Sequence, residues 1–297
     1  MKLLGISLGL GAALCQSLSY IFSGMFVRRF HSSAAVLLVL AHIIMGVLSL
    51  GMMLVVWPER MPENLMFVWP MTGGVIFYLV GQTGLFLALR RADASRVSPM
   101  LGLKLVILPI VTVLFLHHTY GAQQWLAVAL CVVAAVGLNN SGEKLPTQSL
   151  GWILFACLGY SLSDLNITAL IVHFKYLGIT RAVLFSASMS YVLSGIAGGI
   201  ALPFITRPTK SMWINATPFA LTWFTAMLLL FACFGTIGTI FGNIVQATRG
   251  LISIAVGVVL ARAGMHHLER NVERNVLLRR LAAALLMTGA IVLFSLA

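Results

Sequence analysis

Three ionisable side chains lie inside long apolar stretches of the sequence: Asp164, Lys104 and Arg249. If these stretches cross a membrane, a charged side chain at that depth costs several kcal/mol unless it is paired or hydrated. Each of the three is therefore a functional candidate. Two cations and one carboxylate can bind a charged solute, and a buried carboxylate can also take up and release a proton.

Each charge also has a structural explanation that the sequence leaves open. Lys104 and Arg249 could extend their long side chains toward the nearer membrane interface. Asp164 could pair with one of these cations and never contact a solute. A third alternative is that Asp164 titrates and couples transport to protons, with its pKa set by burial and by neighbouring cations.

Uncharged polar side chains lie at similar depth in other apolar runs. They are Gln16, Ser19, His42, Gln82, Asn166, Asn243 and Gln246. Such residues more often form hydrogen bonds between helices than contacts with a ligand. We take Gln82, Asn243 and Gln246 as the better binding candidates and keep Asn166 and Gln16 as further ones. Tyr20 and Tyr78 could line a cavity, but packing is the commoner role of such aromatic residues.

The composition shows which elements must position these side chains. Hydrophobic residues make up 60% of the 297 residues and charged residues only 9%, against about 25% in a soluble domain. Since about 20 apolar residues cross the hydrocarbon core as a helix, the chain has room for about ten crossings. The continuous runs lack the alternation of barrel strands. The predicted fold class is therefore all-α, a polytopic membrane protein with ten transmembrane helices.

The ten apolar runs are separated by short polar segments. They are 3–25, 33–57, 66–89, 97–116, 122–139, 149–173, 182–204, 216–238, 246–264 and 279–296. The join between the eighth and ninth runs, near Gly242-Asn243, carries no charge before Arg249, so this division is the least marked.

An internal duplication divides the chain near its centre. The segment 115–120, with its His-His pair, aligns with 264–269 at an offset of 149 residues. We therefore predict a five-helix repeat at 1–138, a polar linker at 139–148 and a second repeat at 149–297. Five is an odd number, so the two halves must enter the membrane from opposite sides, as in many transporters with inverted repeats.

The offset brings two of the buried cations into relation. Arg249 corresponds to Met100, which lies one helical turn from Lys104 on the same face. If these faces meet, both cations and Asp164 could share a polar cavity of net positive charge. Such a cavity favours an anionic or zwitterionic solute with a carboxylate or phosphate group.

The basic residues give the orientation. With ten crossings, four basic residues fall on one face and thirteen on the other, so the positive-inside rule places the second face in the cytoplasm and both termini outside. The net charge of +12 thus reflects topology and lipid contacts rather than nucleic-acid binding.

The segment Ala88 to Ser98, which reads ALRRADASRVS, precedes a helix containing Pro109 and a closing helix containing Gly137. This pattern resembles the EamA repeat of the drug/metabolite transporter superfamily, in both halves of the chain. The resemblance implies a ten-helix transporter fold and leaves the substrate open. In the family's pattern a Glu occupies the turn where this chain has Tyr120; it is retained only as Glu269. The family's usual orientation, with cytoplasmic termini, is opposite to that from the charge count.

Several other functions are not supported by the sequence. The four cysteines lie in apolar runs and form no CxxC pair. Within each histidine doublet the two adjacent side chains point to different helix faces, which does not suit a metal site. The sequence contains no P-loop. We therefore predict no metal and no cofactor, and ATP is not expected to be the driving force. An enzyme would need a clustered set of acid/base residues at the membrane interface, which the sequence does not provide, so we also predict no enzymatic activity. The spacings Gly5-xxx-Gly9, Gly195-xxx-Gly199 and Gly238-xxx-Gly242 are typical of close helix packing.

The leading hypothesis is a secondary transporter, working as an exporter of a small polar or amphipathic metabolite by alternating access. The alternatives are an exporter of lipophilic cations and a lipid-carrier flippase. The expected location is the bacterial cytoplasmic membrane, as a monomer or homodimer, with membrane lipid and a small-molecule solute as its partners.

Overall fold

The computed structural model describes residues 2–30, 34–62, 64–92, 94–117, 119–140, 145–205, 207–262 and 273–296. Within these ranges every regular element is a helix. Ten helical segments there are long and apolar enough to cross a membrane. The prediction of an all-α, polytopic membrane protein is therefore confirmed. Helices suit this environment because lipid offers no hydrogen-bond partners, so each spanning segment must satisfy its own backbone groups.

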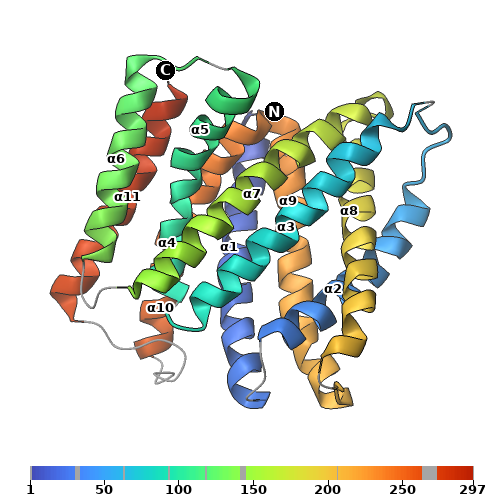
Figure 1. Cartoon of the computed structure of the whole chain (residues 1–297), viewed down its shortest axis with the longest axis horizontal. Helices are drawn as coiled ribbons and strands as arrows, with labels where there is room; N and C mark the ends of the chain where they lie inside the picture. Colours follow the sequence, from blue (N-terminus) through green and yellow to red (C-terminus); the bar gives the residue numbers. More distant parts are fainter. Residues whose placement is uncertain are drawn as a thin grey trace. The chain divides into compact units, whose positions relative to one another are not determined.

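The α-helices follow the predicted runs closely (Figure 1). They are α1 (Lys2–Phe30), α2 (Ala34–Val55), α3 (Val68–Leu89), α4 (Ala94–Met100), α5 (Lys104–Leu116), α6 (Ala122–Asn139), α7 (Thr147–His173), α8 (Ile179–Ala201), α9 (Lys210–Ala247), α10 (Arg249–Arg262) and α11 (Arg274–Ser295). Short 3₁₀ helices cover Leu65–Phe67, Leu101–Leu103, Lys175–Leu177 and Leu202–Phe204.

The fourth span is interrupted, although the sequence predicts one run over 97–116. Helix α4 ends at Met100, the residues Leu101–Leu103 form a 3₁₀ turn, and α5 begins at Lys104. Pro99 lies inside α4, where a proline removes one intrahelical hydrogen bond and crowds the preceding turn. The interruption places Lys104 at the start of a new helical segment in the middle of the span.

The boundary between the eighth and ninth spans differs from the predicted join near Gly242-Asn243. Gly238, inside α9, has φ 79° and ψ 167°, a conformation that only glycine adopts without strain. The ninth span therefore begins at Phe241 rather than at residue 246. Gly238 breaks the helix, which corrects its interpretation as a close-packing position.

The chain forms two compact units, one of Met1–Leu79 with Leu162–Gly242, the other of Val80–Ser161 with Asn243–Ala297. We call them unit 1 and unit 2. In unit 1, α2 packs against α8. A Cβ atom added to Gly46 would lie 2.7 Å from the Cα of Gly195, so the two backbones are nearly in contact.

In unit 2, α6 packs along α11, and α4 packs against α10 (Figure 1). A Cβ atom added to Gly250 of α10 would lie 2.9 Å from the Cα of Pro99 in α4.

Gly46 and Gly195 are 149 residues apart, which is the offset of the predicted duplication. The inverted repeat and its boundaries at 1–138, 139–148 and 149–297 remain predictions.

Candidate functional site: a cationic cavity in unit 2

Lys104 and Arg249 occupy equivalent depths in their spans. The fourth span covers Arg96–Leu114 and the ninth Phe241–Val259, so each cation is eight residues from the start of its span. At the helical rise this is about 12 Å from the end of the span, close to its middle. Arg249 is thus deeper than the sequence predicts, because its span begins earlier. This depth weighs against extension of either side chain to the interface.

The side chains of Lys104 and Arg249 line one narrow cavity. It is lined by side chains from α4, the 3₁₀ turn, α5, the end of α9 and the start of α10, and its volume is about 280 Å³ with its open mouth included. The polar residues that line it are Ser98, Lys104, Asn243, Gln246 and Arg249. All five are buried, with 2–7% of their surface exposed.

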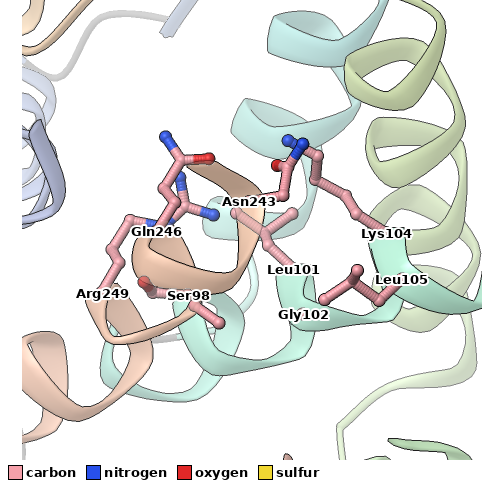
Figure 2. A pocket seen from close by; sticks show the side chains of 9 residues that line it. Ser98, Leu101, Gly102, Lys104, Leu105, Asn243, Gln246 and Arg249 are labelled. Carbon is pink, nitrogen blue, oxygen red and sulfur yellow. The ribbon is translucent and has the colours of Figure 1, made fainter. Parts of the chain in front are cut away.

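Figure 2 shows how these side chains are directed. Lys104, from α5, and Asn243, from α9, point toward each other. The Arg249 side chain lies beside that of Gln246, which precedes it by less than one helical turn. The helix break that ends α9 at Ala247 and starts α10 at Arg249 places both groups at the cavity, with Ser98 below them.

An aromatic ring and an amide lie behind Lys104. Its Nζ atom is 5.7 Å from the centroid of the Tyr160 ring, within the range of a cation–π interaction. The Tyr160 hydroxyl donates a hydrogen bond of 3.0 Å to Oε1 of Gln82. A Cβ atom at Gly81 would lie 2.7 Å from the Tyr160 ring, so α3 approaches α7 closely here. This packing holds the ring beneath the ammonium group.

The broken fourth span is connected to its neighbours by polar contacts. The Ser253 hydroxyl of α10 donates to Ser98 Oγ of α4 at 2.9 Å. The Cys157 thiol of α7 lies 3.9 Å and 3.7 Å from the carbonyl oxygens of Met100 and Leu101. These contacts satisfy part of the backbone that the 3₁₀ turn releases, as irregular structure inside a membrane requires.

The described lining of the cavity is rich in hydrogen-bond donors. Its polar lining consists of an ammonium, a guanidinium, two amides and a hydroxyl, and no carboxylate is among the described lining residues. Ammonium, guanidinium and amide N–H groups are hydrogen-bond donors, and a guanidinium grips carboxylate or phosphate in bidentate fashion. In the described part of the chain, no group of three or more His, Cys, Asp or Glu residues is arranged to hold a metal ion.

The structure therefore brings together four of the predicted site residues: Lys104, Arg249, Asn243 and Gln246. Gln82 does not line the cavity, but it bonds to Tyr160, whose ring lies next to Lys104. The other three lie in unit 1. Asp164 is buried in α7, with 4% of its surface exposed.

The two amides of unit 1 make packing contacts. Asn166 donates to the Leu162 carbonyl at 2.8 Å and packs on Gly73 of α3. Gln16 Nε2 lies 3.6 Å from the Met227 sulfur. Contacts of this kind are typical of helix packing in membranes.

Sequence reasoning missed Ser98, Tyr160 and Ser253. Serine and tyrosine are common in membrane helices, and neither residue type by itself marks a cavity. The spacing Ser98 to Lys104 gave no signal, because the 3₁₀ turn between them changes which side chains share a face.

The chain resembles one protein family in sequence and a set of solved structures in fold. The model of the EamA-like transporter family matches residues 3–140. No curated protein matches the chain. Among 26 chains of solved structures that match, one described as "Crystal structure of protein" has a TM-score of 0.59 and 15% sequence identity, and the match covers 100% of this chain and 98% of that one.

The structural match, at this low identity, concerns the fold alone. The family match covers the first five predicted membrane helices and includes Lys104 and Gln82. Ten candidate membrane helices in the described chain fit the architecture that the sequence resemblance implied. Residues 3–140 are thus similar to the EamA-like transporter family, and the ten candidate membrane helices of the described chain are consistent with a transporter of the drug/metabolite transporter superfamily.

Proposed function

We propose that the chain is a secondary transporter that exports a small polar or amphipathic metabolite carrying a carboxylate or phosphate group, as an anion or a zwitterion. The observation that carries this proposal is the burial of Lys104 and Arg249 at mid-span in one cavity. A charged side chain at that depth is costly to bury and is a functional candidate by default, and two cations at one cavity suit a solute with an anionic group.

The groups around the cavity have separate tasks in this proposal. Arg249 binds the anionic group through two parallel N–H bonds, and Lys104 adds a second positive charge from the opposite span. Asn243 and Gln246 form hydrogen bonds with the remaining polar atoms of the solute, since an amide group can both donate and accept. The cavity is narrow in this conformation, so the solute enters after the helices move apart, as alternating access requires.

Two further parts of the proposal concern coupling and location. Asp164, buried in unit 1, is a candidate proton carrier, because a buried carboxyl is the group whose charge a membrane protein can most readily use for coupling. We place the protein in the bacterial cytoplasmic membrane, as a monomer or homodimer. An exporter of lipophilic cations is less well supported, since no acidic residue is among the described residues lining this cavity.

The proposal is tested by transport into proteoliposomes with a panel of four solutes: a small organic phosphate, a dicarboxylate, a zwitterionic amino acid and the lipophilic cation tetraphenylphosphonium. We expect the first three classes to contain the substrate. Lys104→Met and Arg249→Met should each lower its transport at least about tenfold, because each removes a charge-assisted hydrogen bond.

Two exposed basic residues provide matched controls, Lys210→Met and Arg207→Met, which should transport like the wild type. Unchanged transport in both Lys104→Met and Arg249→Met would overturn the proposal, as would transport of tetraphenylphosphonium alone. Asp164→Asn is compared at several pH values. Loss of transport together with loss of its pH dependence supports proton coupling, whereas wild-type behaviour removes Asp164 from the proposal.

A further inference from the structure

A second cavity lies in unit 1 and shares no lining residue with the cationic one. It is formed between α3, α7, α8 and α9 and has a volume of about 240 Å³ with its open mouth included. The residues that give it its chemistry are Tyr78, Ser163, Ser190, Tyr191, Ser194 and Met227. No charged side chain is among the described residues that line it.

The three serine hydroxyls all donate their hydrogen to backbone carbonyls. Ser163 donates to Gly74 at 2.9 Å, across from α7 to α3. On α8, Ser190 donates to Ser186 at 2.9 Å and Ser194 donates to Ser190 at 2.8 Å. A hydroxyl that has given its one hydrogen keeps only its lone pairs for further bonds. These serines therefore offer acceptors to whatever occupies the cavity.

The Tyr78 hydroxyl is held in a similar way, by a directed relay of hydrogen bonds. His42 Nδ1 lies 2.7 Å from the Leu38 carbonyl, which can only accept, so Nδ1 carries a hydrogen and Nε2 of the neutral ring accepts. Tyr78 lies 3.2 Å from this Nε2 and donates to it. Trp223 Nε1 donates to the Tyr78 oxygen at 2.6 Å. The hydrogen of Tyr78 is thus committed to His42.

Aromatic rings and a thioether complete the lining. The rings of Tyr78 and Tyr191 meet edge to face at 5.8 Å, and Phe231 also lines the cavity. Aromatic faces carry partial negative charge and attract cations. The Met227 sulfur is a weak acceptor. Acceptor oxygens, π faces and a sulfur are all attractive to a cation that brings its own N–H donors, and unattractive to an anion.

We propose that this cavity binds a primary ammonium group, R–NH₃⁺. A primary ammonium brings three N–H donors for the three serine oxygens, while the tyrosine rings stabilise its charge. A trimethylated ammonium has no N–H donor and is larger, so the cavity discriminates against it. The site is independent of the transport function proposed above, because none of its residues belongs to the Lys104–Arg249 cavity.

The experiment measures binding of n-butylammonium to the purified full-length protein in detergent, by isothermal titration calorimetry, with butyltrimethylammonium and n-butanol as comparison ligands. We expect a dissociation constant of about 1 mM or lower for n-butylammonium, with at least about tenfold weaker binding of the other two. The double variant Ser190→Ala/Ser194→Ala should weaken n-butylammonium binding at least about tenfold, because it removes two acceptors.

Ser188→Ala is the matched control, since Ser188 is buried on the same helix and bonds its own i−4 carbonyl but does not line the cavity. It should bind like the wild type. Lys104→Met/Arg249→Met should also bind n-butylammonium normally, which separates failure of this site from failure of the anion site.

Three results would overturn the proposal: no binding by the wild-type protein, equal binding of butanol or butyltrimethylammonium, and equal losses in Ser188→Ala and the double variant. Displacement of n-butylammonium by millimolar Na⁺ with equal affinity would also overturn it, by showing an alkali-cation site.

Discussion

The two cavities differ in the charge of the ligand that we propose for each, although both are lined by residues of apolar helices. In unit 2, Lys104 and Arg249 can only donate hydrogen bonds, and the two amides supply both donors and acceptors. In unit 1 the three serine hydroxyls and Tyr78 act as acceptors, because their hydrogens are donated to carbonyls and to His42. The difference shows that a membrane cavity is defined by which hydrogens remain available, as much as by the residue types that line it.

The close glycine contacts give the largest expected effect on this comparison. Gly195→Val places a branched side chain where a Cβ atom alone would lie 2.7 Å from the Gly46 Cα. Overpacking costs about 1–3 kcal/mol, and a backbone contact this close belongs at the upper end of that range, so we expect a fall in Tm of about 6–12 °C, with loss of n-butylammonium binding in unit 1.

Gly250→Val should have the corresponding effect in unit 2, where the neighbour is Pro99. It should reduce anion transport while leaving n-butylammonium binding close to that of the wild type. Gly199→Val is the control, because nothing lies within 4 Å of a Cβ atom there. If Gly195→Val and Gly250→Val affect both ligands equally, the two cavities are not separate sites. Tm is measured by scanning fluorimetry in detergent.

A smaller effect is expected at the helix break. Gly238→Ala forces a residue with a Cβ into φ 79° and ψ 167°, at a cost of about 1–3 kcal/mol. Since Gly238 lies just before the start of the ninth span, relief of this strain would move Arg249 and lower anion transport several-fold. Gly199→Ala, on another span, should change neither Tm nor transport. A Gly238→Ala protein with wild-type Tm and transport would show that the break has no part in positioning Arg249.

The smallest expected effect comes from removal of single hydroxyls in the two units. Tyr78→Phe removes two hydrogen bonds, from Trp223 and to His42, and should lower Tm by about 2–4 °C. Tyr160→Phe removes one, to Gln82, and keeps the ring below Lys104. It should lower Tm by about 2 °C or less, since such bonds contribute about 0.6 kcal/mol in membranes. A larger fall for Tyr160→Phe would reverse the ranking of the two networks.

Much of the fold could be predicted from the sequence. Continuous apolar runs of membrane-spanning length predict ten helices because lipid offers no partner for an unpaired backbone group. The buried charges were also visible, since a lysine or arginine inside such a run is rare. The offset of 149 residues that relates the two predicted halves also separates Gly46 from Gly195, whose backbones meet in unit 1.

The details of the site were less predictable. The ninth span starts at Phe241 because Gly238 takes a left-handed φ, and the surrounding apolar sequence gives no sign of that conformation. Ser98 and Tyr160 join the cationic cavity through a 3₁₀ turn and through close packing at Gly81. The acceptor character of the second cavity depends on the direction of each hydroxyl hydrogen, which composition does not contain.

The sequence by itself determined that this protein lies in lipid, how many times it crosses, and which charges it holds at depth, because each of these follows from the solvent and from residues close together in the chain. The tertiary structure decided which polar groups share a cavity. Those contacts join residues such as Ser98 and Ser253, which are far apart in the sequence, and they depend on helix breaks and packing that local hydrophobic patterns do not specify.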